Sequence, residues 1–357
     1  MARPRAPPPF PANFRVAAAG KDVHMVLQVE ELAVDLVTPA GSIRAVDDVS
    51  FAVRAGQTVA LVGESGCGKT LTALGVMRLL PPAARIGRGR LLLKHEGGTA
   101  DLAALPERAL RAFRGNRIAM VFQEPMTALN PVMRVADQIA EPIVIHQRVS
   151  WKAARARAVE LLGAVGVPAP AERARGYPHE LSGGLRQRAL IAMALACEPD
   201  LLIADEPTTA LDVTVQAQIM LLLKSLQKDT GMGLLLITHD LGIVAETCDH
   251  VHVMYGGRIV ESAPVLDLFA APRHPYTGGL LSSIPSRSPV GSALKTIPGQ
   301  VPPLGHLPSG CRFRDRCPSA DDACRQDIPL VQDALLRLRC IHPLTPKKNV
   351  VGAGATP

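Results

Sequence analysis

The clearest chemical signal in the sequence is a glycine-rich run, Gly63-Glu64-Ser65-Gly66-Cys67-Gly68-Lys69-Thr70, which fits the pattern G-x-x-x-x-G-K-[ST] at every specified position. Glycines let such a loop turn tightly, so that its backbone N–H groups face a phosphate chain. Lys69 would then reach the outer phosphates, and the Thr70 hydroxyl would bind Mg²⁺. The competing interpretation is a glycine-rich turn that matches the pattern by chance.

Acidic residues and a histidine follow two apolar runs further along the chain. Leu201–Ala204 ends at Asp205 and Glu206, and Gly233–Thr238 ends at His239. Because the carboxyl ends of buried parallel strands lie at one edge of a sheet, we expect these three side chains to face one crevice. In a nucleotide site, one acid would hold hydrated Mg²⁺ and the other would act on the attacking water. A solvated strand end and a structural histidine are the alternatives.

The seven cysteines fall into two groups. Three lie inside apolar segments and are expected to be small buried thiols: Cys67, Cys197 and Cys248. The other four, Cys311, Cys317, Cys324 and Cys340, have the spacing C-x5-C-x6-C-x15-C, without the short C-x2-C pairs of most structural zinc sites. Four thiolates from a loop suit a [4Fe-4S] cluster. Zinc, and free or reversibly oxidised thiols, stay open as alternatives.

A sheet and several helices must position these residues. Short apolar runs from Val26 to Val53, broken at Pro39-Ala40-Gly41, predict antiparallel strands. Val59–Val62 predicts a buried strand that leads into the glycine-rich loop, and Leu71–Leu80 predicts a helix that leaves it. Further along we expect a hairpin-like stretch over Gly87–Leu93, a strand over Ile118–Phe122 ending at Gln123, helices over Pro131–Val167 and a helix up to Cys197.

Length and composition limit the class of protein. The 357 residues, 47% of them hydrophobic, supply core for about two or three domains. No apolar run approaches the roughly 18 residues of a membrane span, so we expect a chain that is soluble by itself. Residues 1–24 are rich in proline and lack a signal-peptide core, which predicts a disordered tail on a cytoplasmic protein. The net charge of +7 permits an acidic partner, yet the basic residues are scattered rather than clustered.

Taken together in this order, the motifs resemble those of the ATP-binding subunit of an ABC transporter. The resemblance is closer to the oligopeptide/dipeptide importer branch, on the runs Phe122–Pro131, Tyr177–Arg188 and Asp205–Gln218. Thr208-Thr209 and Ala192-Met193-Ala194 resemble the D-type subunit of that branch, which works beside an F-type ATPase. The similarity spans about Leu27 to Pro343.

The resemblance implies roles for the matched residues. Asp205 would orient Mg²⁺ and its waters together with Thr70, Glu206 would be the general base, and His239 would contact the γ-phosphate. Gln123 would sense the metal and the attacking water. Ser182, Gly183 and Gly184 would close over ATP held by a partner's loop, and Asp212 would bridge the two subunits. Pro125–Ile145 would dock a permease helix.

The implied architecture is α/β: a P-loop ABC ATPase with a RecA-like core, an antiparallel β subdomain and an α-helical subdomain. We expect the ATPase domain over 25–270, with the helical subdomain at about 131–190. A small irregular extension that carries the four cysteines would follow over 271–346, with a disordered tail at 347–357. One departure is that no aromatic residue lies between Met25 and Ser50, so adenine would pack on aliphatic side chains such as Leu36, Val37 or Val46.

The function implied is ATP hydrolysis that energises peptide import at the cytoplasmic face of the membrane. The expected partners are the F-type ATPase, two membrane permeases and an extracytoplasmic binding protein, with ATP and Mg²⁺ bound in the site. Import of another small solute such as nickel or haem is an alternative. A soluble ABC ATPase acting on nucleic acid is a second alternative, although the coiled coils or zinc modules of such proteins are not seen between Gly63 and His239. A regulatory subunit with a dead site is the third, but Lys69, Asp205, Glu206 and His239 are all present.

Overall fold

A computed structural model describes residues 24–39, 41–209, 211–284, 296–333 and 335–345. Its central sheet has the strand order β11-β12-β10-β9-β3-β8-β7-β6. The five strands from β9 to β6 are parallel, and β10, β12 and β11 continue the sheet, each antiparallel to the strand before it. The strand bounds are β3 Thr58–Val62, β6 Ile118–Val121, β7 Leu201–Asp205, β8 Gly233–Thr238, β9 His250–Tyr255, β10 Arg258–Pro264, β11 Val331–Asp333 and β12 Leu336–Leu338.

Side chains of these parallel strands alternate between two hydrophobic layers. In β7, Leu202 and Ala204 join one buried cluster, whereas Leu201 and Ile203 join another. Successive side chains of a strand point to opposite faces, so a strand covered on both faces reads as an unbroken apolar run. This explains why the strands expected over Val59–Val62 and Gly233–Thr238 were recognisable, and both predictions are confirmed.

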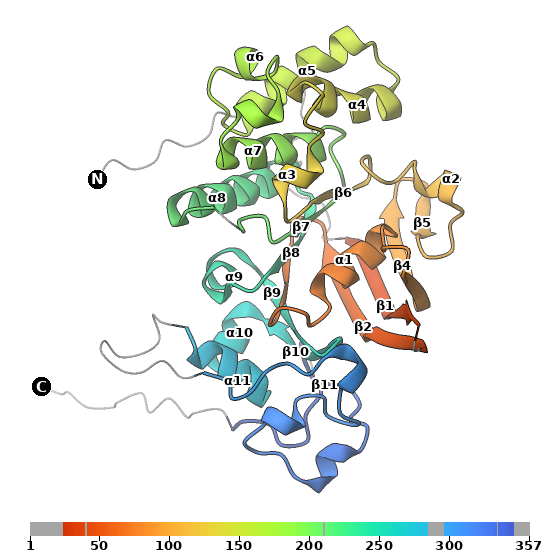
Figure 1. Cartoon of the computed structure of the whole chain (residues 1–357), viewed down its shortest axis with the longest axis vertical. Helices are drawn as coiled ribbons and strands as arrows, with labels where there is room; N and C mark the ends of the chain where they lie inside the picture. Colours follow the sequence, from red (N-terminus) through yellow and green to blue (C-terminus); the bar gives the residue numbers. More distant parts are fainter. Residues whose placement is uncertain (1–23, 40, 210, 285–295, 334, 346–357) are drawn as a thin grey trace, which may run out of the picture.

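A second sheet, β2-β1-β4-β5, is antiparallel and lies beside α1 (Figure 1). Its strands are β1 Met25–Thr38, β2 Gly41–Arg54, β4 Ala84–His95 and β5 Gly98–Asp101. The antiparallel pair before the loop is confirmed. The hairpin expected over Gly87–Leu93 is wrong, because this stretch lies inside the single strand β4 and the turn into β5 comes after His95. Gly89 has φ +111, and a Cβ there would lie 2.7 Å from Leu32 Cα, so this glycine permits a close approach of two strands rather than a turn.

The α-helices are spread along the chain, and four of them form one end of the molecule (Figure 1). The α-helices are α1 Lys69–Met77, α2 Glu107–Leu110, α3 Pro125–Ala128, α4 Val135–Gln147, α5 Trp151–Ala164, α6 Pro170–Arg173, α7 Gly183–Ala194, α8 Val213–Thr230, α9 Leu241–Thr247, α10 Val265–Ala270 and α11 Pro275–Ser282. Helices α4 to α7 gather at one end, and residues 296–333 and 335–345 form the opposite end (Figure 1). Helices within Pro131–Val167 and before Cys197 are thereby confirmed.

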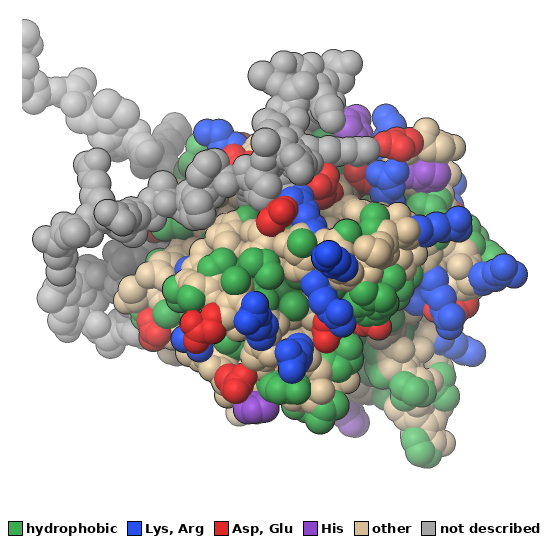
Figure 2. Space-filling view, turned by 90° about the horizontal axis from the view of Figure 1, so that it is seen from above, with side chains coloured by type: hydrophobic (Ala, Val, Ile, Leu, Met, Phe, Trp, Pro, Cys, Tyr) green, Lys and Arg blue, Asp and Glu red, His purple; other side chains and the backbone are tan. Residues whose placement is uncertain are grey.

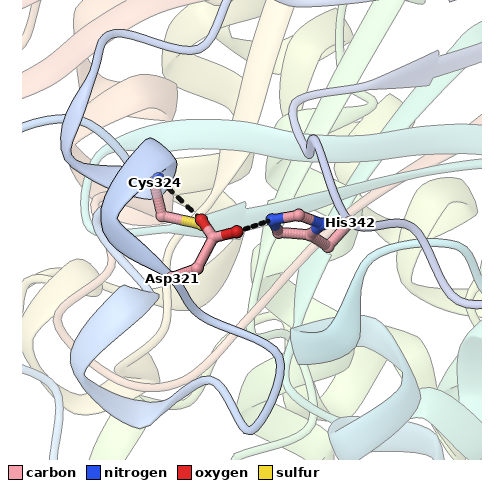
Figure 3. Close-up of side chains that lie close together, drawn as sticks. All are labelled: Asp321, Cys324 and His342. Carbon is pink, nitrogen blue, oxygen red and sulfur yellow. Dashed lines mark hydrogen bonds and ion pairs between the residues drawn. The ribbon is translucent and has the colours of Figure 1, made fainter.

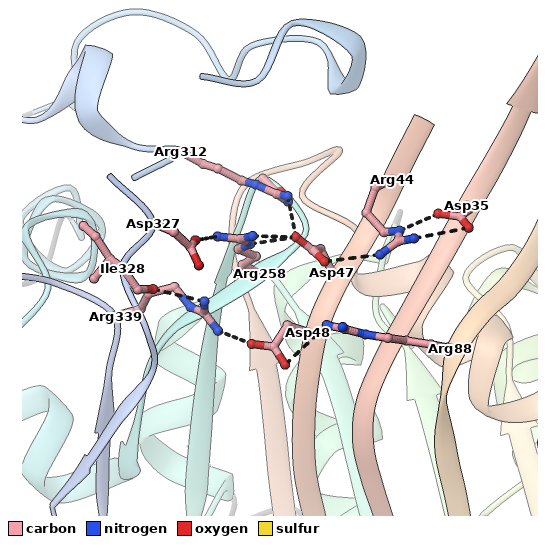
Figure 4. A network of polar contacts seen from close by, with 11 residues as sticks. Asp35, Arg44, Asp47, Asp48, Arg88, Arg258, Arg312, Asp327, Ile328 and Arg339 are labelled. Carbon is pink, nitrogen blue, oxygen red and sulfur yellow. Dashed lines mark hydrogen bonds and ion pairs between the residues drawn. The ribbon is translucent and has the colours of Figure 1, made fainter. Parts of the chain in front are cut away.

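Charged side chains fasten the C-terminal residues to the antiparallel sheet (Figure 4). Asp47 of β2 accepts hydrogen bonds from Arg258 at 2.8 Å and from Arg312 at 2.7 Å. The next residue, Asp48, accepts from Arg339 at 2.6 Å. Burial alone raises the pKa of Asp47, but the hydrogen bond from Arg258 and the nearby guanidinium charges hold it below its ordinary value. The extension is therefore docked by buried charge as well as by strands β11 and β12.

Surface features add little to the search for a site. None of the helices in the described part of the chain combines the length and apolar character that crossing a membrane requires. Figure 2 shows Lys and Arg side chains scattered among acidic and apolar ones over the one face that it draws. The expected tails at residues 1–24 and 347–357 fall almost wholly outside the described residues.

Candidate nucleotide-binding and hydrolysis site

The glycine-rich loop connects the buried strand β3 to helix α1, as the sequence predicts. Gly63 has φ +153, and a Cβ there would lie 2.2 Å from the carbonyl oxygen of Met254. Gly68 has φ +104, and a Cβ there would lie 2.9 Å from Met254 Cε. Any other residue at Gly63 would collide with the β9 backbone, so the loop's shape depends on glycine here.

Lys69 lies inside the loop with only 5% of its surface exposed. Its Nζ donates to the carbonyl oxygens of Gly63 at 2.8 Å and Glu64 at 3.0 Å. The ammonium group is thus held at the mouth of the loop by neutral acceptors. It is placed where a phosphate could replace those carbonyls as its partner.

Thr70 and Asp205 supply adjacent oxygen atoms for a divalent cation. The Thr70 hydroxyl donates to Asp205 Oδ1 at 3.3 Å, across the gap between α1 and the end of β7. Burial raises the pKa of Asp205 to about 6, the charge of Glu206 adds to the rise, and Thr70 and Lys69 oppose it. Hydroxyl and carboxylate oxygens are the donors that Mg²⁺ prefers, so the pair fits that ion.

Glu206 is the centre of the polar contacts at this edge of the sheet. Its Oε2 accepts from the Thr209 hydroxyl at 2.9 Å and from Gln123 Nε2 at 3.3 Å. Its Oε1 lies 3.3 Å from His239 Nδ1. The backbone of Glu206 has φ 43, and its N–H donates to Ile237 O at the end of β8. A carboxylate held in this way at the end of a strand can accept a proton from a water molecule in the adjoining cleft.

One cleft contains most of the residues that the sequence predicts to act on a nucleotide. Its walls include Gly63, Glu64, Ser65, Gly66, Gly68, Lys69, Thr70, Gln123, Glu206 and His239. Cys67 is fully buried beneath the loop and can contribute only backbone groups. Of the three strand-end side chains expected to face one crevice, Glu206 and His239 line this cleft, whereas Asp205 is buried beside Thr70.

The cleft also has walls that sequence reasoning missed. Leu280 of α11 and the residues Gly299, Gln300, Val301 and Leu304 line it. Leu36, Val37 and Val46, expected to pack on adenine, are not among the residues that line it. The aliphatic walls come instead from Leu71, Leu241 and the C-terminal extension. Nothing in the local sequence pattern signals that a segment more than 200 residues after the loop returns to it.

Four predicted residues lie away from this cleft. Ser182 is the N-cap of α7 and is followed by Gly183 and Gly184, while Asp212 is the N-cap of α8 and accepts from Val215 N at 2.9 Å. Gly184 packs closely on Val215, which joins the two helix starts. Ser182, Gly183 and Asp212 are exposed, so they are available to a second protein chain rather than to this chain's own cleft.

The four C-terminal cysteines gather in the extension. Cys311 N donates to Cys324 O at 2.9 Å. Burial is the main cause that raises the pKa of Cys311, Cys317 and Cys340, and the neighbouring thiols of the group add to it in each case. Among the other cysteines, Cys67 and Cys197 are buried as expected, whereas Cys248 is only partly buried.

A tighter group of mixed ligand atoms includes one of these cysteines (Figure 3). Asp321, Cys324 and His342 each offer an atom, and these atoms lie within 4.8 Å of one another. His342 Nε2 lies 2.8 Å from Asp321 Oδ2. Sequence reasoning missed Asp321 and His342 because it considered thiol ligands alone.

Comparison with known protein families gives two matches along the chain. The ABC transporter family matches residues 46–209, and the family described as the oligopeptide/dipeptide transporter C-terminal region matches residues 260–324. The first match contains the glycine-rich loop and Glu206. The second contains Arg316 and three of the four clustered cysteines.

Individual relatives agree with these matches. The chain is 54% identical to a putative peptide import ATP-binding protein of Brucella abortus (strain 2308), over 85% of this chain and 92% of the relative. It is 49% identical to the dipeptide transport ATP-binding protein DppD of Bacillus subtilis, over 85% and 90%. It is 47% identical to the oligopeptide transport ATP-binding protein OppD of Salmonella typhimurium, over 91% and 96%. Among solved structures, a dimeric bacterial ABC transporter cassette superimposes with a TM-score of 0.59 at 26% identity, covering 67% of this chain and 98% of the cassette.

Proposed function

The chain belongs to the ABC transporter family of ATP-binding proteins, in the oligopeptide/dipeptide branch, and we propose that it hydrolyses ATP to energise the import of peptides. The observation that carries the proposal is the single cleft in which Lys69, Gln123, Glu206 and His239 meet. The relatives named for peptide import support the substrate class.

In the proposed mechanism, the glycine-rich loop and Lys69 bind the phosphate chain of ATP. Thr70 and Asp205 hold Mg²⁺, which supplies charge neutralisation on the phosphates when bound. Glu206 accepts the proton of the attacking water, and Gln123 and His239 position that water and the γ-phosphate. Thr209 restrains the Glu206 carboxylate by its hydroxyl.

The site acts in a pair. Ser182, Gly183 and Asp212 lie exposed, Gly184 is half-buried beside them, and all four are outside this chain's cleft, as expected of groups that complete a site on another chain. We assign that second chain to an F-type ATPase. The isolated chain should therefore bind Mg-ATP but hydrolyse it slowly, because half of each site is supplied by the partner.

The membrane partners contact the surface that follows Gln123. Among the described side chains of Pro125–Ile145, Val132 is 79% exposed and Ile145 is 63% exposed. Apolar side chains of this kind suit a helix of a permease. The chain would then lie at the cytoplasmic face of the membrane, with an extracytoplasmic binding protein delivering the peptide. We divide it into an ATPase domain at 25–270 and an extension at 271–346.

The four clustered cysteines are proposed to hold a [4Fe-4S] cluster. Their placement together in one extension, where Cys311 N donates to Cys324 O at 2.9 Å, supports a shared thiol-bound group. Zinc is a specific second candidate, because Asp321, Cys324 and His342 form a mixed oxygen, sulfur and nitrogen donor set. Iron, sulfide and zinc analysis of anaerobically purified protein separates the two.

The test of the transport function uses the chain assembled with its permeases and F-type partner in proteoliposomes, with the binding protein present. Addition of di- and oligopeptides should stimulate ATP hydrolysis and lead to peptide accumulation. If peptides have no effect and duplex DNA at physiological salt stimulates the ATPase, the nucleic-acid alternative replaces this one. Stimulation by nickel or haem, but not by peptides, would change the substrate class.

A further inference from the structure

An arginine of the C-terminal extension contacts the phosphate-binding loop directly. Arg316 Nη1 lies 2.6 Å from Glu64 Oε2, and Arg316 Nη2 lies 3.0 Å from Glu64 Oε1. The two residues are 252 positions apart in the sequence. A contact in which both nitrogens of a guanidinium meet both oxygens of a carboxylate fixes orientation as well as distance.

The same guanidinium also contacts the segment Pro298–Val301, which forms one wall of the cleft. Its Nε donates to Pro298 O at 2.8 Å, and Nη2 donates to Gly299 O at 3.3 Å. Gly299 and the two residues that follow it, Gln300 and Val301, line the cleft. Arg316 therefore contacts two different sides of the site, the loop that receives phosphate and the segment that faces it.

The surroundings of Arg316 make it rigid. Its side chain is 5% exposed, and its guanidinium carbon lies 5.8 Å from the ring centre of Tyr255 and 5.9 Å from that of Phe313. Tyr276, packed on the same rings, accepts a hydrogen bond from Glu64 N at 2.8 Å. Both the backbone and the side chain of Glu64 are thus fixed by residues that follow the nucleotide-binding core.

Charge gives this contact a consequence for nucleotide binding. Without Arg316, the Glu64 carboxylate would stand next to the negative phosphates in the same cleft and would repel them. An arginine guanidinium is always protonated in proteins, so Arg316 can cancel the Glu64 charge.

Resting on the proposed function, we propose that Arg316 is a positioning residue of the ATP site: it neutralises and orients Glu64 of the phosphate-binding loop and fixes the Gly299–Val301 wall. The extension is then part of the nucleotide site rather than an appendage to it. Arg316 acts through Glu64 and the wall and does not itself touch the reacting atoms.

The test measures Mg-ATP affinity of the full-length chain by titration calorimetry, together with its melting temperature without nucleotide. Arg316→Gln should raise the Kd for Mg-ATP by roughly tenfold. Glu64→Gln added to it should restore most of the affinity, because the repelling charge is gone. In the assembled ATPase, the single variant Arg316→Gln should raise KM for ATP and leave kcat at saturating ATP nearly unchanged.

Arg314→Gln is the matched control, since Arg314 lies in the same turn but bonds Ser309 and Asp315 instead of the loop. It should bind Mg-ATP like the parent. If Arg316→Gln does not fold, Arg316→Lys keeps the charge without the two-point contact and should show a smaller loss of affinity. The inference is wrong if Arg316→Gln binds Mg-ATP like the parent, or, should that variant not fold, if Arg316→Lys does. It is also wrong if the increase in Kd of the double variant equals the product of the increases of Glu64→Gln and Arg316→Gln measured alone. A parent chain that does not bind Mg-ATP at all would instead overturn the proposed function.

Discussion

The Thr209 hydroxyl donates a hydrogen bond to Glu206 Oε2 at 2.9 Å, and so orients the carboxylate at the end of β7. Thr209 follows Glu206 by three residues, and the turn between them is closed by Thr209 N donating to Glu206 O at 3.1 Å. The residue proposed as general base is therefore held by its own loop as well as by Gln123 and His239.

Glu206→Gln should separate nucleotide binding from hydrolysis. The amide keeps an oxygen that can accept from Thr209, but it cannot take a proton from water. We expect the ATPase rate of the assembled transporter to fall by roughly 10²–10⁴-fold, with Mg-ATP affinity retained. Glu246→Gln, at an exposed glutamate of α9, is the control and should leave the rate unchanged. A Glu206→Gln variant with the parental rate would remove Glu206 from the role of base.

Asp47→Asn should loosen the attachment of the extension. Asp47 is 12% exposed and accepts from both Arg258 and Arg312, so its loss leaves two guanidinium groups without their common partner. We expect the free energy of unfolding to fall by about 2–3 kcal/mol, with earlier proteolysis of residues after 296. Denaturant titration and limited proteolysis measure the two effects. The pair of Arg314 with the exposed Asp315 supplies the comparison, because Asp315→Asn should change stability by less than about 0.5 kcal/mol.

The motifs of the site were readable from the sequence because each is local. A strand covered on both faces produces an apolar run, and its last residues mark the edge where Asp205, Glu206 and His239 meet. The glycines of the loop follow from the backbone conformations it adopts, as at Gly63. Such features depend on neighbours in sequence, so pattern and spacing suffice to predict them.

The remaining walls of the site depend on pairs far apart in the sequence. Neither Arg316 nor Glu64 belongs to a periodic pattern that would pair them, and the contact exists only because the extension folds back over β9 and β10. The expectation that Leu36, Val37 or Val46 packs on adenine likewise left out residues far along the chain. It considered early strands alone, whereas Val301 and Leu304 line the cleft.

The buried side chain of His274 should make the protein less stable in mild acid. His274 caps α11 by accepting from Tyr276 N at 3.0 Å, and burial lowers its pKa from 6.5 to about 3. A group whose pKa is lower in the folded state binds protons preferentially when unfolded, so its stabilising contribution is complete above pH 6.5 and is lost as pH falls toward 3. This residue alone should make the chain about 2 kcal/mol less stable at pH 5 than at pH 7.

Denaturant titration at the two pH values of the parent and of His274→Asn tests the sign. Asparagine retains a side-chain acceptor for the helix cap but has no titrating group, so the variant should lose that share of the pH dependence. His306→Asn, at an exposed histidine, should keep the parental dependence. If the free energy of unfolding of His274→Asn depends on pH as strongly as that of the parent, His274 is not held neutral by the fold.

Loss of the [4Fe-4S] cluster that we propose at the clustered cysteines should weaken nucleotide binding as well as remove the colour of the protein. Three docking arginines are sequence neighbours of these cysteines: Arg312 follows Cys311, Arg316 precedes Cys317 and Arg339 precedes Cys340. They bond Asp47, Glu64 and Asp48 respectively. A restraint on the cysteine segments is therefore also a restraint on the contacts to β2 and, through Arg316, on the contact that holds the phosphate-binding loop.

Cys324→Ser should lower the iron and sulfide content of anaerobically purified protein and raise the Kd for Mg-ATP by about threefold to tenfold. Chelation of the parent protein should reproduce both changes, whereas Cys248→Ser, outside the group, should leave metal and affinity unchanged. Iron loss with unaltered Mg-ATP affinity would show that the extension holds the loop without help from the cysteines. A parent preparation with zinc and no iron would assign the site to Asp321, Cys324 and His342, and Asp321→Asn should then release the zinc.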